Sequence, residues 1–228
     1  MNKHLVVLGA LLLDVVTAVI LWPQLPESVP VHWDLSGAPN RYGSRWELVL
    51  VAPGVTLLLW ALVSFLSRID PKVRAQQSAV ATPGDEAGSD GMGGGAGTVV
   101  LLIVIGFLSL IHVSAMLLAS GVPLTGHTLM GLSLAALQLA LGNYFPRVRP
   151  NYFIGVRTPW TLANDAVWRR THRLAGRSFV LSGIVLALST TLLPSPVGYA
   201  LMIGSVLAAA GVPAIYSYLD WKRETSGQ

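Results

Sequence analysis

Six long apolar runs constrain the fold of this chain more than any other feature. A helix needs roughly 20 predominantly apolar residues to cross the hydrocarbon core of a bilayer, and it then makes all its backbone hydrogen bonds internally. The runs are Leu5–Trp22, Leu48–Ser67, Val99–Ser120, His127–Phe145, Phe179–Leu193 and Val197–Leu219. The sequence therefore predicts an all-α polytopic membrane protein, built as a bundle of six transmembrane helices.

The residue composition agrees with a membrane protein and excludes several kinds of site. Only 11% of the residues are charged, against about 25% in a typical soluble domain. The chain has no cysteine, which excludes disulfides, thiolate metal sites and cysteine nucleophiles. Its net charge of +4 reflects basic residues placed around membrane spans, so it does not indicate a nucleic-acid partner. We expect no cofactor and no metal.

The basic residues divide unevenly between the two sides of such a bundle. The two termini and the loops after the second and fourth runs together hold thirteen Lys and Arg residues, whereas the opposite side holds only Arg41 and Arg45. The positive-inside rule places the basic side in the cytoplasm. We therefore expect a multi-pass protein of the bacterial cytoplasmic (inner) membrane with both termini in the cytoplasm.

The chain divides into three segments by composition. Residues 1–70 hold the first two spans and a structured outer loop, and residues 99–228 hold four spans with an arginine-rich cytoplasmic loop. Between them, residues 71–98 end in the run Gly91–Gly97, which is almost entirely glycine. Glycine-rich sequence of this kind is a flexible coil without a core. We expect residues 71–98 to be a cytoplasmic linker.

The outer loop contains a short polar and aromatic cluster. Val29–Trp33 has the character of a short extended piece, and the residues after Asp34 are dense in turn formers. His32 and Asp34 would share one face of a strand, with Trp33 between them. Two ligands without a third are a weak metal signal, so we favour a structural or partner-binding role for His32, Trp33 and Asp34.

Seven arginines lie between Arg147 and Arg177. Thr161 and Asn164 are both good N-caps, and from there one arc of a helix collects basic residues while the opposite arc collects Trp168 and His172. The basic arc consists of Arg169, Arg170, Arg173 and Arg177. Such a helix lies at an anionic leaflet, so these arginines are predicted to contact lipid headgroups just before the fifth span.

Lipid anchoring does not account for the other polar and aromatic residues of this loop. Arg157 lies outside the basic stripe, and two roles are open to it: it clamps an acidic group or it holds loop carbonyls. A specific binding or switching role for the loop therefore stands beside pure anchoring. The candidate binding residues are Asn151, Gly155, Arg157, Thr158, Trp160, Thr161, Trp168 and His172.

The pattern Asn-x-x-x-Gly-x-Arg-Thr-Pro-Trp-Thr-Leu from Asn151 to Leu162, followed by Trp168 and His172, resembles the SdpI family of bacterial membrane immunity proteins. The Pro-Val-His-Trp-Asp run of the outer loop looks like the uncharacterised extracytoplasmic segment that often precedes that motif. The resemblance implies a non-enzymatic protein that protects against a secreted toxic peptide. It also implies signalling, in which a cytoplasmic regulator is held at the membrane.

Several polar residues fall inside the predicted spans, among them Asp14, His112 and Gln138. Asp14 lies about 13 Å and His112 about 20 Å from the inner ends of their spans at 1.5 Å per residue, so contact between them is expected. Intramembrane ionisable groups are costly and often functional, but interhelical hydrogen bonding is the simpler explanation for them. The alternative function is therefore a small-solute or proton-linked transporter using Asp14 and His112.

Overall fold

The computed structural model describes residues 3–34, 39–66, 95–152 and 154–226 of the chain. Most of the predicted glycine-rich linker, residues 71–94, lies outside these ranges, as do the turn-rich residues 35–38. The division of the chain into three segments therefore stays a prediction.

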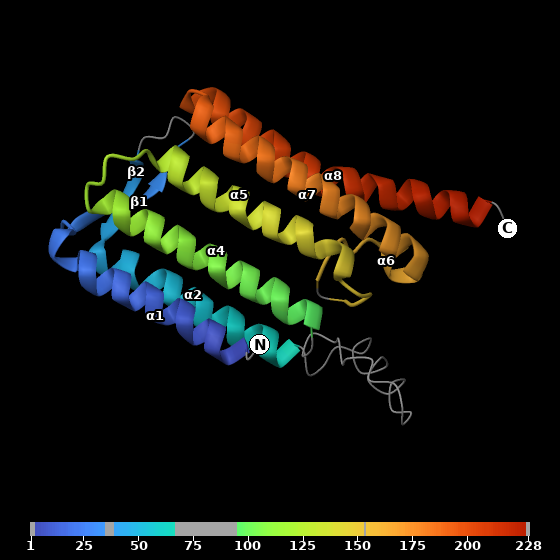
Figure 1. The fold of residues 1–228 in the computed structure, drawn as a ribbon, viewed down its shortest axis with the longest axis horizontal. Coiled ribbons are helices and arrows are strands. Elements are labelled where there is room, and N and C mark those ends of the chain that lie inside the picture. The colour runs from blue at the N-terminus through green and yellow to red at the C-terminus, as the bar shows by residue number, and fades with distance from the viewer. Residues whose placement is uncertain (1–2, 35–38, 67–94, 153, 227–228) are drawn as a thin grey trace. The chain divides into compact units, whose positions relative to one another are not determined.

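Six helices in the described residues are long and apolar enough to cross a membrane. They are α1 (Lys3–Leu21), α2 (Arg45–Leu66), α4 (Gly95–Ala119), α5 (Gly126–Tyr144), α7 (Asp165–Leu192) and α8 (Ser195–Ser226) (Figure 1). The predicted all-α fold with six spans is confirmed, and the chain is a multi-pass membrane protein. The cytoplasmic location of its termini stays a prediction.

The remaining elements are short and lie between the long helices. A single turn, η1 (Trp22–Gln24), leads into the antiparallel strands β1 (Ser28–Trp33) and β2 (Pro39–Ser44). Ser28 pairs with Ser44, and the register is irregular between Pro30 and Trp33. The extended piece predicted at Val29–Trp33 is thus β1, whereas its partner β2 was not predicted. After α5 come a second turn, η2 (Phe145–Arg147), and the short helix α6 (Pro159–Ala163).

Helix α7 unites two elements that the sequence suggested were separate. Of the two predicted N-caps, Asn164 is the one that starts it, because its Oδ1 accepts hydrogen bonds from the N–H groups of Ala166 (2.8 Å) and Val167 (3.2 Å). The helix then continues without a break to Leu192. The basic helix and the short fifth span are therefore one helix of 28 residues, since no proline interrupts the sequence between them.

The chain forms two compact units, each with its own buried cluster. The first unit comprises Met1–Trp60, Leu102–Leu137 and Gly183–Gly204, and the second comprises Ala61–Leu101, Gln138–Ser182 and Ser205–Gln228. Helices α2, α4, α5, α7 and α8 each contribute residues to both units.

The core of the first unit joins the hairpin to the helices. Val29 of β1 and Met116 of α4 are fully buried, together with Ala18 of α1 and Leu48 of α2. At the end of α1, the ring of Trp22 packs against Trp46 with centroids 4.5 Å apart. The hairpin is thus fixed against its own unit by apolar packing.

In the second unit, helices α5 and α7 approach closely at two glycines. A Cβ atom on Gly142 would lie 2.8 Å from the carbonyl oxygen of Gly176, and a Cβ on Gly176 would lie equally close to the carbonyl oxygen of Gly142. Small residues allow such close contact between membrane helices. The contact sets the buried face of α7 against α5 and η2, where Phe145, Trp168 and Ala175 form the core.

Candidate functional site

The loop that carries the predicted binding residues belongs to the second unit, and Asn151 organises its first turn. Its Oδ1 accepts the backbone N–H of Ile154 at 2.6 Å. Its Nδ2 donates to the carbonyl oxygens of Arg149 at 2.8 Å and Ile154 at 3.1 Å. Asn151 is buried, so its amide replaces backbone partners that the irregular loop cannot supply.

Gly155 and His172 fix the middle of the loop to α7. Gly155 has a φ of 107°, and a Cβ there would collide with His172 Nε2. The backbone N–H of Val156 donates to this same Nε2 at 3.1 Å. His172 Nδ1 lies 2.9 Å from the carbonyl oxygen of Trp168, which can only accept, so Nδ1 carries the proton. Both nitrogens of a neutral ring are therefore engaged, Nε2 with the loop and Nδ1 with the backbone of α7.

Trp168 fastens α7 to the chain that follows η2. Its side chain is fully buried, and its ring stacks on His172 with centroids 4.1 Å apart. The indole N–H donates to the carbonyl oxygen of Val148 at 2.8 Å. Buried Trp N–H groups normally find such a partner, so Trp168 and His172 together form one rigid support under the loop.

The threonines of the motif cap helix α6. Thr158 accepts the backbone N–H of Thr161 at 3.3 Å, and Thr161 Oγ1 accepts the backbone N–H of Thr158 at 3.0 Å. This reciprocal arrangement is a capping box, with Pro159 at the first helical position. The hydroxyl oxygens of Thr158 and Ser217 lie 2.9 Å apart, and Trp160 packs on Tyr218 with ring centroids 5.0 Å apart. Helix α6 is thereby attached to α8.

Among the candidate binding residues of the motif loop, Arg157 is exposed. Its Nη1 donates to the carbonyl oxygen of Tyr152 at 2.9 Å, so the structure has it holding a loop carbonyl. Tyr152, whose carbonyl oxygen it holds, is itself 45% exposed.

The basic stripe of α7 contains one arginine with a different environment from the rest. Arg169, Arg173 and Arg177 are exposed, as the headgroup prediction requires. Arg170 instead forms ion pairs with Asp220 at 2.8 Å and Glu224 at 2.6 Å. These two acidic residues were missed in the sequence, although their spacing of four residues places them on one face of α8. The headgroup prediction therefore stays with the three exposed arginines.

Asp14, Ser109 and His112 are brought together in the first unit. All three side chains are buried. Ser109 and His112 are near enough to the Asp14 carboxyl group to interact with it electrostatically. Within the described ranges, however, neither carboxylate oxygen of Asp14 and neither ring nitrogen of His112 has a hydrogen-bond partner. Gln138 is also buried, but it belongs to the second unit.

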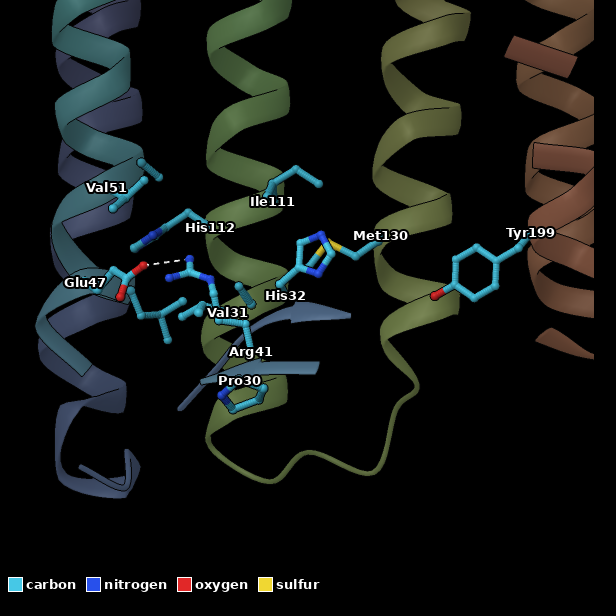
Figure 2. Close-up of a pocket in the computed structure, with 13 residues that line it drawn as sticks. Pro30, Val31, His32, Arg41, Glu47, Val51, Ile111, His112, Met130 and Tyr199 are labelled. Carbon is cyan, nitrogen blue, oxygen red and sulfur yellow. Dashed lines mark hydrogen bonds and ion pairs between the residues drawn. The ribbon is translucent and has the colours of Figure 1, made fainter. Parts of the chain in front are cut away.

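A cavity of about 430 Å³ in the first unit lies beside this cluster (Figure 2). Its apolar wall comes from the hairpin and from α2, α4 and α5. Its polar groups are His32, Arg41, Glu47, His112 and Tyr199. The sequence had singled out only two of them, because an ion pair such as Arg41–Glu47 (2.8 Å) depends on the strand pairing that was not predicted.

The outer-loop cluster is only partly assembled around the cavity. His32 lines the cavity, and its Nδ1 lies 2.6 Å from Asn40 Oδ1. Asp34 does not line the cavity, but it interacts electrostatically with the phenol group of Tyr199, which does. The side chain of Trp33 lies outside the described part of the chain. Within that part no three His, Asp or Glu side chains gather as a metal site would require.

Comparison with known proteins separates the chain into two matched regions. Residues 147–217, which contain the whole motif loop and its supports, match the SdpI/YfhL protein family. The resemblance to the SdpI family is confirmed. Residues 9–57, with the hairpin and Asp14, match a domain of unknown function (DUF1648).

The SdpI likeness extends over nearly the full length. The Immunity protein SdpI of Bacillus subtilis (strain 168) is 25% identical over 223 residues, covering 98% of each chain. An uncharacterized protein of Archaeoglobus fulgidus is 35% identical over 64 residues, which is 25% of this chain and 34% of the relative. No solved structure matches.

Proposed function

We propose that this chain is a non-enzymatic membrane protein that protects its cell against a secreted toxic peptide. The observation that carries the proposal is the similarity to the Immunity protein SdpI over 98% of both chains. Similarity of this extent supports the immunity role at the level of the family. The six apolar helices agree with it, since they make the chain a multi-pass bacterial membrane protein.

The geometry of the motif loop supports a division of labour within it. Asn151, Thr161, Trp168 and His172 are buried and hydrogen-bonded, so they hold the loop in one shape. Arg157 is exposed on the loop that they support. In this proposal the loop faces the cytoplasm, and its exposed surface meets a regulator that reports toxin binding.

Expression in a toxin-sensitive bacterium tests the immunity proposal. The wild-type chain is expected to raise the tolerated toxin concentration, whereas Arg157→Ala should weaken signalling and leave membrane insertion intact. A chain that inserts normally and gives no tolerance to any secreted peptide tested would overturn the proposal. Full toxin tolerance with Arg157→Ala would indicate that the loop serves only as a membrane anchor.

A second candidate, proton-linked transport of a small solute, is favoured by one observation. Asp14, Ser109 and His112 are buried together without completed hydrogen bonds, and such groups inside a membrane often mark ion pathways. Proteoliposomes that take up a solute with the wild-type chain and not with Asp14→Asn would support transport. Unchanged toxin tolerance with Asp14→Asn would mean that immunity does not depend on this cluster.

A further inference from the structure

The cavity of the first unit has an apolar wall and few polar groups. Eight apolar side chains line it beside the five polar ones, and they come from four elements. They are Pro30 and Val31 of β1, Leu48, Val51 and Ala52 of α2, Ile111 and Ala115 of α4, and Met130 of α5. Sites of this size and composition are typical of small apolar ligands that are oriented by a small number of hydrogen bonds.

His112 supplies an unsatisfied polar group to this wall. Its side chain is only 2% exposed and lines the cavity (Figure 2). Neither ring nitrogen has a partner among the described residues, which is a costly state for a buried imidazole. The Asp14 carboxyl group is near enough to interact electrostatically with the ring, and an imidazole always carries at least one N–H donor. An oxygen acceptor on a ligand would give the His112 ring the hydrogen-bond partner that it lacks.

The way into the cavity is also apolar. Val51 of α2 is 54% exposed and lines the cavity, and α2 is one of the six helices suited to cross a membrane. The cavity therefore reaches a surface that lipid tails cover. Near the hairpin, by contrast, its rim carries the exposed Arg41–Glu47 ion pair. This combination suits a ligand that is apolar along its body and polar at one end.

We infer that this cavity binds an apolar side chain of a membrane-partitioned peptide, with His112 donating a hydrogen bond to a carbonyl or carboxylate oxygen of the same peptide. The inference rests on the proposed immunity function and names the site at which the peptide is met. Asp14 acts as a positioning residue for the His112 ring, and the Arg41–Glu47 pair borders the polar end of the ligand.

The absence of cysteine from the chain allows a direct test in purified proteoliposomes. Ala115→Cys places a single thiol on the cavity wall. Ala119→Cys is the matched control, because Ala119 lies one turn further along α4, is buried to the same degree and does not line the cavity. Modification by benzyl methanethiosulfonate, followed by mass spectrometry, should be at least about tenfold faster at position 115, and equal rates would overturn the cavity as a binding site.

Protection by small compounds tests the role of His112. 4-Phenylbutyrate and its N-methyl amide carry an oxygen acceptor, whereas butylbenzene has the same apolar body without one. Both acceptors should slow labelling of Ala115→Cys, and adding His112→Leu should weaken this protection about tenfold, as loss of one buried hydrogen bond predicts. His112→Gln keeps a donor and should retain protection. Equal protection by butylbenzene, or protection unchanged in His112→Leu, would overturn the inference.

Failure of the inference can be told apart from failure of the proposed function. Labelling needs no toxin, whereas tolerance is measured in cells. There, His112→Leu is expected to lose tolerance and His112→Gln to keep it. Full tolerance with His112→Leu overturns the assignment of the cavity to the peptide and leaves immunity in place. A wild-type chain without any tolerance overturns immunity, while the labelling result still decides whether the cavity binds acceptors.

Discussion

At the scale of single residues, the motif works by using up the hydrogen-bonding capacity of its own side chains. Neutral His172 accepts from Val156 and donates to Trp168, so it has no free nitrogen for a ligand or for proton transfer. Gly155 is required because its φ is positive and because His172 occupies the place of a Cβ. The sequence singled out these residues, but their structural role follows only from the contacts.

Gly155→Ala tests this close contact. The substitution forces a side chain into a backbone conformation that costs about 1–3 kcal/mol, and it also displaces His172. We expect a lower free energy of unfolding in detergent micelles. Gly204→Ala is the control, since a Cβ there meets nothing within 4 Å. Equal stability of the two variants would contradict the role of Gly155.

Trp168→Phe tests the hydrogen bond to Val148. Phenylalanine retains an aromatic ring on His172 but leaves the buried Val148 carbonyl without the indole donor. We expect a loss of about 1–3 kcal/mol in unfolding free energy. Trp46→Phe serves for comparison because Trp46 is half exposed, and it should change stability much less.

At the scale of elements, one arginine of the basic stripe joins two helices. Arg170 of α7 pairs with Asp220 and Glu224 of α8, whereas Arg169, Arg173 and Arg177 remain exposed. Helical periodicity correctly put all four on one arc of α7. It could not identify Arg170 as different, because that depends on which face of α8 packs against it. Strand β2 was not predicted for the same reason, because it is defined by its pairing with β1.

Arg170→Ala should therefore destabilise the protein more than Arg173→Ala. The first substitution removes the cation that is paired with the buried Asp220, at an expected cost of about 1–2 kcal/mol for a partly exposed pair. The second removes an exposed charge, which should mainly weaken binding to anionic vesicles, by about 1 kcal/mol. Unfolding and vesicle-binding measurements on both variants give the comparison. The opposite order of stabilities would contradict the pairing.

At the scale of the whole molecule, the six spans could be predicted because membrane thickness fixes the length of an apolar helix. The start of the fifth span was less well defined, because the polar, basic stretch after Asn164 is also helical and continues into the apolar run as one helix. The contact between Asp14 and His112 could be predicted from the similar depths of the two residues in their spans. The cavity next to it was not, since its wall is assembled from residues far apart in the sequence.

The positive-inside rule predicts the orientation of the chain in the membrane, and single cysteines can test this prediction. Tyr42→Cys lies on the hairpin and Ser226→Cys at the end of α8, and both positions are exposed. A membrane-impermeant maleimide added to intact cells should label position 42 and spare position 226 until the membrane is opened. Labelling of position 226 in intact cells would place the C-terminus outside and overturn the proposed topology.

The immunity proposal is tested most directly by the toxin concentration that halves the growth rate of sensitive cells. It is measured for cells that carry the wild-type chain, His112→Leu or an empty vector, at matched amounts of protein in the membrane. We predict a higher value for the wild-type chain and a return toward the vector value for His112→Leu. A wild-type value equal to that of the vector, with the protein properly inserted, would contradict the account.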